Sequence, residues 1–207
     1  MSSRDVILGR IRDAITLAPP VPQEIPREYR TGRTMGDTQR LDLFIDRLVD
    51  YKAQVHQCGS DDIPATLARV LARAGAVRVG VPAGLDGSWL TGFTGEVVVD
   101  SPDVPAPDLS SLDGVVTAST VSCAETGTIF LDGSPDQGRR ALTLVPDLHV
   151  CVVPLATVEV GVPEAMARLV PERPTTMISG PSATSDIELE RVEGVHGPRN
   201  LHVVIVS

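Results

Sequence analysis

The chain has 207 residues, of which 42% are hydrophobic and 22% are charged, a balance that indicates a globular domain and excludes an intrinsically disordered chain. Its formal net charge of -9 would repel a phosphate backbone, so we expect no nucleic-acid partner. The apolar runs, such as residues 150–155, are too short to span a membrane, and residues 1–17 lack the continuous apolar stretch of a signal peptide. We therefore expect a cytoplasmic protein that holds any anionic ligand by local devices, such as backbone N–H groups.

The N-terminal part of the chain predicts two helices that are separated by a proline-rich break. Residues 5–15 carry an apolar stripe at helical spacing, and residues 37–51 carry a second one. Between them, the four prolines of residues 18–26 exclude a regular helix and indicate an extended linker. We therefore divide the chain into an N-terminal helix with its linker, residues 1–36, and an α/β domain, residues 37–207. The first helix either packs on a neighbouring molecule or lies against the domain, and the sequence leaves both possibilities open.

After residue 51 the chain alternates between strand and helix patterns. The sequence predicts a strand at 53–58, a helix that is capped by Ser60 and ends at Gly75, and a strand at 77–81. This order is typical of parallel pairing, because the crossover between parallel strands needs a helix. Further strands are expected at 96–100, 114–118, 128–131, 149–154, 175–179 and 201–206, and a further helix at 163–169. Strands between residues 97 and 131 follow one another without long helices, which favours a mixed sheet or a small antiparallel subsheet there. The sequence thus predicts an α/β fold with a mostly parallel sheet.

Cysteines and histidines give no metal signature. The separations of Cys58, Cys123 and Cys151 match no zinc or iron–sulfur pattern, and their odd number favours reduced, partly buried thiols. The alternative is a reactive Cys123 beside Glu125. No two histidines have a spacing that suits a metal, and the glycine-containing loop 82–87 lacks the dinucleotide fingerprint. We therefore expect neither a metal nor a cofactor, and we treat the loop 82–87 as a wall of a possible site.

Residues 179–188 form the densest candidate motif. They directly follow the strand expected at 175–179, and Gly180 permits a tight turn there. The hydroxyl groups of Ser182, Thr184 and Ser185 stand where a helix is expected to start, and Ser185 with Glu188 matches a capping box. One interpretation is a ligand site, because open α/β sheets bind carboxylates and phosphates at the carboxyl ends of strands. The other is a strand, a turn and a well-capped helix without a ligand.

Two further turns carry titratable candidates for catalysis. Glu125 lies in a tight turn of threonines and glycine at a strand end, where a carboxylate can serve as nucleophile or general base, or can simply accept hydrogen bonds within the turn. His196 stands among small residues before the last strand, where it could titrate near neutral pH beside a ligand, or serve only as a structural hydrogen-bonding residue. The sequence leaves both pairs of alternatives open.

Taken together, these motifs resemble, in order and spacing, those of the lactate utilization protein C family, whose members share the LUD domain. The matching segments are Ala124-Glu125-Thr126-Gly127-Thr128, Ser179-Gly180-Pro181-Ser182 with Asp186-Ile187-Glu188, and Gly194-Val195-His196-Gly197-Pro198. The resemblance covers nearly the whole chain. It implies a Rossmann-like, mostly parallel sheet with a small antiparallel portion, similar to the fold of ribose-phosphate isomerases and coenzyme A transferases.

The resemblance also implies a function and a set of site residues. The function is a part in the oxidation of L-lactate to pyruvate, beside iron–sulfur partner proteins that would carry the clusters this chain lacks. The implied site positions are Glu125, Thr126, Gly127, Thr128, Ser179, Gly180, Ser182, Asp186, His196 and Gly197, around a small carboxylate or another anionic metabolite. The chain departs from the family at Ala183, where members often have a basic or amide side chain, which implies a weaker phosphate site. The alternatives are a stand-alone enzyme that uses Glu125 on an acyl or sugar-phosphate substrate, and a regulatory module with a degenerate pocket.

Overall fold

A computed structural model of the chain describes residues 2–18, 24–181, 183–184, 192–193 and 197–207. Its centre is a six-stranded sheet in which every neighbouring pair is parallel. In spatial order the strands are β1 (Gln54–Cys58), β12 (Asn200–Val206), β7 (Leu148–Pro154), β4 (Gly114–Thr117), β2 (Arg78–Val81) and β3 (Glu96–Val99). The expected mostly parallel α/β fold is therefore confirmed.

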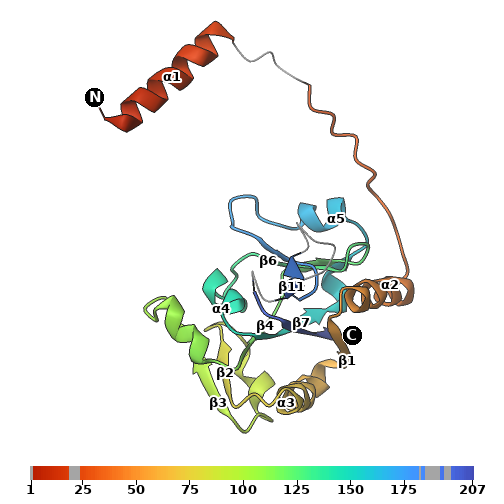
Figure 1. Cartoon of the computed structure of the whole chain (residues 1–207). Coiled ribbons are helices and arrows are strands. Elements are labelled where there is room, and N and C mark those ends of the chain that lie inside the picture. Colours follow the sequence, from red (N-terminus) through yellow and green to blue (C-terminus); the bar gives the residue numbers. More distant parts are fainter. Residues whose placement is uncertain (1, 19–23, 182, 185–191, 194–196) are drawn as a thin grey trace.

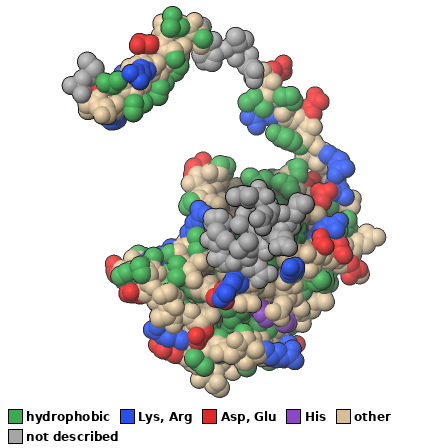
Figure 2. Space-filling model, in the orientation of Figure 1, with side chains coloured by type: hydrophobic (Ala, Val, Ile, Leu, Met, Phe, Trp, Pro, Cys, Tyr) green, Lys and Arg blue, Asp and Glu red, His purple; other side chains and the backbone are tan. Residues whose placement is uncertain are grey.

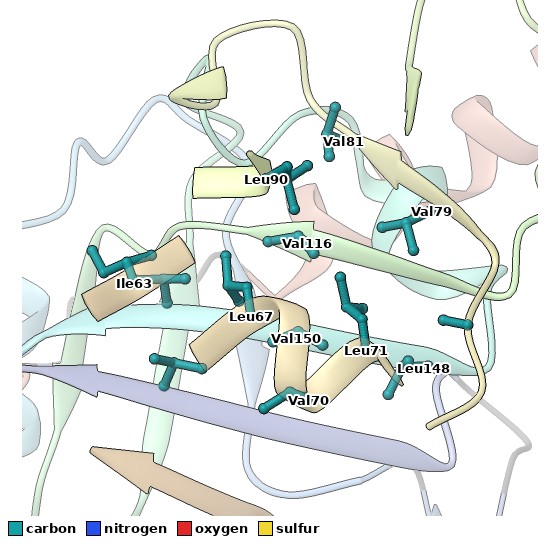
Figure 3. Close-up of a cluster of buried hydrophobic side chains, with 13 residues drawn as sticks. Ile63, Leu67, Val70, Leu71, Val79, Val81, Leu90, Val116, Leu148 and Val150 are labelled. Carbon is teal, nitrogen blue, oxygen red and sulfur yellow. The ribbon is translucent and has the colours of Figure 1, made fainter. Parts of the chain in front are cut away.

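The helix α3 (Ile63–Arg73) covers one face of this sheet (Figure 3). Its apolar stripe, which includes Leu67 and Leu71, packs with Val116 of β4 and Val150 of β7, and all four side chains are almost fully buried. The expected cap is wrong: Ser60 lies in a short 3₁₀ helix (Ser60–Asp62), and α3 starts after it with Pro64 in its first turn. A second 3₁₀ helix (Gly87–Leu90) packs beside α3.

The opposite face is covered by α2 (Asp37–Asp50) and by a smaller, mixed sheet. This sheet has the order β8 (Val158–Glu159), β5 (Val121–Cys123), β6 (Thr128–Leu131) and β9 (Thr176–Ile178). The pairs β5–β6 and β6–β9 are antiparallel, whereas β5–β8 is parallel. Phe44 of α2 and Ile129 of β6 are buried in one cluster with Val203 of β12. The expected antiparallel portion is confirmed for β5 and β6, while β3 and β4 belong to the parallel sheet.

Short elements complete the domain around these layers. They are a 3₁₀ helix (Ala106–Ser111), α4 (Arg140–Leu144), a 3₁₀ helix (Leu155–Thr157) and α5 (Val162–Ala167). The helix expected to start within residues 182–185 is contradicted where the structure describes it. There the backbone of β10 (Ala183–Thr184) pairs antiparallel with β11 (Val192–Glu193). At residues 183–184 a strand-paired backbone thus stands where the helix start was expected, and the rest of the expected helix lies outside the described residues.

The N-terminal helix α1 (Ser3–Leu17) lies apart from the rest of the molecule (Figure 1). Ser2 and Asp5 form a capping box at its start, and no residue of α1 is buried. Its exposed apolar side chains include Ile7, Ile11 and Ile15, and Figure 2 shows hydrophobic side chains along this helix. In the part of the chain that the structure describes, no helix combines the length and apolarity that crossing a membrane would require.

Candidate functional site

Two cavities open beside each other where the β6–α4 loop meets the sheet. The larger has a volume of about 680 Å³ and the smaller about 320 Å³. Arg140, Thr143 and Thr176 line both cavities, so the two share a wall. Pro82 and Ala83, which follow β2, also line the larger cavity, whereas residues 84–87 of the same loop do not.

The floor of the larger cavity is a polar network around Asp132, the first residue after β6. The Asp132 carboxylate, whose side chain is only 3% exposed, accepts hydrogen bonds from Thr120 Oγ1 at 2.9 Å, Ser134 Oγ at 2.6 Å and Arg173 Nη1 at 3.0 Å. Burial alone would raise the pKa of Asp132, but these hydrogen bonds together hold the pKa below its usual range. Gln137 accepts a 2.8 Å bond from the backbone N–H of Asp132. The loop is thus fixed before any ligand arrives.

Three arginines line the larger cavity, and two of them are already paired. Arg139 makes a bidentate ion pair with Asp100 through two 2.8 Å contacts and donates another bond to the carbonyl of Val104. Arg173 is paired with Asp132. Arg140 differs: among the residues that the structure describes, none forms an ion pair or hydrogen bond with its exposed guanidinium group. Of the cavity-lining cations that the structure describes, Arg140 is therefore the one available to an anionic ligand at the shared wall.

The smaller cavity brings together two of the three motifs from the sequence. Ser179 and Gly180, which follow β9, lie on its lining with Gly197, which precedes β12. His149 of β7 also lines it, and its Nε2 lies 2.8 Å from Thr117 Oγ1. Burial lowers the pKa of His149 to about 4, so the imidazole is neutral at physiological pH. Described residues of two motif loops, together with His149 and Arg140, thus line one cavity.

The third motif joins this region through a chain of hydroxyl groups. Thr126 Oγ1 lies 2.7 Å from Thr128 Oγ1, which in turn lies 2.8 Å from Ser179 Oγ. The intervening Gly127 has a φ of +60°, and a Cβ there would come within 2.8 Å of Arg47 Cβ at the end of α2. Gly180, with a φ of +83°, approaches Tyr51 in the same way. These motif residues therefore also fasten the smaller sheet to α2.

Glu125 lies on neither cavity. Its carboxylate accepts hydrogen bonds from Arg33 Nη1 at 2.6 Å and from Arg30 Nη2 at 3.3 Å, both in the segment that precedes α2. The backbone N–H of Gly32 donates a 2.8 Å bond to Glu164 of α5 nearby. Glu125 thus anchors the segment before α2, a contact that the sequence does not reveal because it joins residues more than 90 positions apart.

Several predicted site residues lie outside the described residues. Ser182, Ser185, Asp186 and His196 are among them, and Thr184 is described only as part of the backbone of β10. Conversely, the motif search missed Asp132, Arg139, Arg140 and Arg173 around the larger cavity. The sequence feature that could have indicated these residues is the pair Arg139-Arg140, which follows a loop with two glycines. Two adjacent arginines stand out in a chain whose net charge is -9.

The described residues contain no group of three histidine, cysteine or acidic side chains that could hold a metal ion. His56 Nε2 lies 3.1 Å from His202 Nδ1, but these two rings stack without a third ligand among the described residues. Cys123 and Cys151 are fully buried, and burial raises the pKa of the Cys151 thiol to about 12. The buried position of Cys123 favours the unreactive interpretation over a reactive thiol.

Comparisons with known proteins agree on one family. Residues 106–206 match the model of the LUD domain. The chain is 45% identical over 191 residues to the "Lactate utilization protein C" of Deinococcus radiodurans, an alignment that covers 90% of this chain and 88% of that protein. The protein of the same name from Bacillus subtilis is 33% identical over 100 residues, or 44% of this chain and 41% of that protein. A crystal structure of a DUF162 family protein from Deinococcus radiodurans superimposes with a TM-score of 0.72 at 38% identity, covering 84% of this chain and all of that one.

Proposed function

Because this chain belongs to the lactate utilization protein C family and carries its LUD domain, we propose that it is a component of the system that oxidises L-lactate to pyruvate. In this proposal the iron–sulfur clusters belong to partner proteins, and the chain supplies a pocket for the carboxylate of a small acid. The observation that carries the assignment to lactate utilization is the 45% identity to a protein of that name over 90% of the chain.

The pocket is proposed to be the smaller cavity. Its volume of about 320 Å³ is at the lower end of the range of small-molecule sites, which suits a small metabolite. Arg140 would bind the carboxylate, since a guanidinium group presents donors that match a carboxylate in geometry and charge. Ser179 and the backbone around Gly180 and Gly197 would contact the rest of the acid. His149 would be a neutral hydrogen-bonding partner and not a cation, because its pKa is about 4.

The alternative of a stand-alone enzyme with Glu125 as nucleophile has less support. A nucleophilic or basic carboxylate must reach the substrate, whereas that of Glu125 is engaged by Arg33 and Arg30 and lies on neither cavity. The alternative would regain support if the purified chain alone converted an acyl or sugar-phosphate substrate and Glu125→Gln abolished that activity.

A gene deletion with complementation tests the proposed function. In a strain without a paralogue or another lactate dehydrogenase, deletion should abolish growth on L-lactate as sole carbon source, and the wild-type gene should restore it. Arg140→Gln should fail to restore growth, whereas Arg10→Gln, which removes the same charge from α1, should restore it. Normal growth of the deletion strain would refute the role in lactate oxidation.

Co-purification tests the proposed partners separately. The tagged chain from lactate-grown cells should bring down proteins that contain iron and acid-labile sulfide. If deletion abolishes growth on L-lactate but the tagged chain purifies without iron–sulfur proteins, the lactate role stands and the direct partnership is refuted.

A further inference from the structure

The larger cavity lies at the point of the parallel sheet where the chain changes direction. From β2 the chain continues to β3 on one side, and from β4 it continues through β5, β6 and α4 to β7 on the other side, although β2 and β4 are neighbours. Pro82 directly follows β2 and Asp100 directly follows β3, so the cavity opens at the carboxyl ends of these strands. Such a crevice is where open α/β sheets bind ligands, nucleotides among them.

The wall of this crevice is held in place by main-chain contacts. The backbone N–H of Gly84 donates to the carbonyl of Pro135 at 2.9 Å, and that of Ala118 donates to the carbonyl of Asp136 at 3.0 Å. A Cβ on Gly84 would come within 2.4 Å of Pro135, so the loops after β2 and β6 are in direct contact. A wall that is fixed in this way needs little reorganisation when a ligand binds.

Size and lining show what kind of ligand fits. A volume of about 680 Å³ falls in the range of ~300–1,000 Å³ that encloses drug-sized ligands, and a three-carbon acid would leave most of it empty. Much of the lining is apolar, with rings or side chains of Pro82, Ala83, Pro102, Leu131, Pro135 and Pro174. At the edge shared with the smaller cavity, Arg140 and the hydroxyl of Thr176 offer hydrogen-bond donors to an anion.

We infer that the larger cavity binds a mononucleotide, with its phosphate at Arg140 and its ring system against the proline-lined wall. The ring fills the apolar space that a small acid leaves open, and the phosphate meets the cation that has no protein partner among the described residues. This site goes beyond the proposed function. It shares Arg140 with the proposed carboxylate pocket, but its ring lies against Pro82, Ala83 and Pro135, which do not line the smaller cavity.

Titrations of the purified full-length chain with FMN, AMP and inorganic phosphate test this inference, with FMN followed by its own fluorescence and the others by calorimetry. At least one of the two nucleotides should bind ten or more times tighter than phosphate. Ala83→Phe, which places a ring in the larger cavity at an exposed position, should weaken nucleotide binding at least tenfold. Val77→Phe, at an exposed position on neither cavity lining, is the matched control and should bind as the wild type does.

Two results would overturn the inference: both nucleotides binding no tighter than phosphate, or Ala83→Phe leaving nucleotide affinity unchanged while circular dichroism shows it folded. Stabilisation by L-lactate is measured on the same samples. Its presence without nucleotide binding would refute only the nucleotide site, and its absence with nucleotide binding would refute only the proposed lactate pocket.

Discussion

The buried His149 predicts a specific dependence of stability on pH. Its imidazole is fully buried beside Thr117, and burial lowers its pKa from 6.5 to about 4. The unfolded chain therefore takes up a proton near pH 6.5, while the folded protein takes it up only near pH 4. Protons thus favour unfolding between these values, so stability is lost as the pH falls. At about 1.4 kcal/mol per pH unit, this one group removes about 3 kcal/mol between pH 7 and pH 4.

Urea unfolding of the wild type and of His149→Gln at pH 7 and pH 4 isolates this contribution. Glutamine keeps a polar atom near Thr117 but does not titrate, so the change with pH should be smaller in the variant by about 3 kcal/mol. Because both proteins contain the same carboxylates and the second buried imidazole, His202, the contributions of these groups to the pH dependence cancel. Burial also lowers the pKa of His202 to about 4. An equal loss of stability in both proteins would refute the claim that His149 is held neutral.

Three contacts can each be tested by a single substitution. Gly127→Ala should lower the free energy of thermal unfolding by about 1–3 kcal/mol, because the positive φ is strained for alanine and its Cβ would lie 2.8 Å from Arg47 Cβ. Unchanged stability would contradict the packing against α2. Asp132→Ala should lower the free energy of unfolding, measured in urea, by roughly 3 kcal/mol, because Thr120, Ser134 and Arg173 lose their buried acceptor. A loss below about 1 kcal/mol would contradict the network. Glu125→Gln should change the free energy of unfolding by less than about 1 kcal/mol, because its ion pairs with Arg30 and Arg33 are exposed. It should nevertheless speed tryptic cleavage at Arg33, since the segment before α2 loses its anchor. An unchanged cleavage rate would contradict that anchor.

Much of the fold follows from the sequence pattern, because long periodic segments report burial directly. The stripe of Leu67 and Leu71 predicts α3, and the apolar run in residues 149–154 predicts β7. The short strands β5 and β8 escape such reasoning, since two or three residues show no period. The antiparallel pairing of β10 with β11 also escapes such reasoning, because local helix-start signals do not show that a partner strand is available.

The candidate site is predictable only in part. The turns around Gly127 and Gly180 are visible in the sequence, because glycine after a strand indicates a special backbone conformation, and the structure gives both a positive φ. The cavities are not visible, since their walls come from segments that are far apart in the chain. Arg139 and Arg173 pair with Asp100 and Asp132, whereas Arg140 has no ion-pair partner in the described part of the chain. This difference depends on three-dimensional contacts alone.

Thermal stabilisation of the purified chain by L-lactate, measured with and without the guanidinium group of Arg140, shows whether the chain has a carboxylate pocket. At ten times its dissociation constant a ligand stabilises the folded state by about 1.4 kcal/mol, or roughly 3–5 °C in Tm for a chain of this size. The wild type and Arg10→Gln should show this rise, and Arg140→Gln should show little or none. An equal rise in all three proteins, or none in the wild type up to high L-lactate concentrations, would contradict a carboxylate pocket at Arg140.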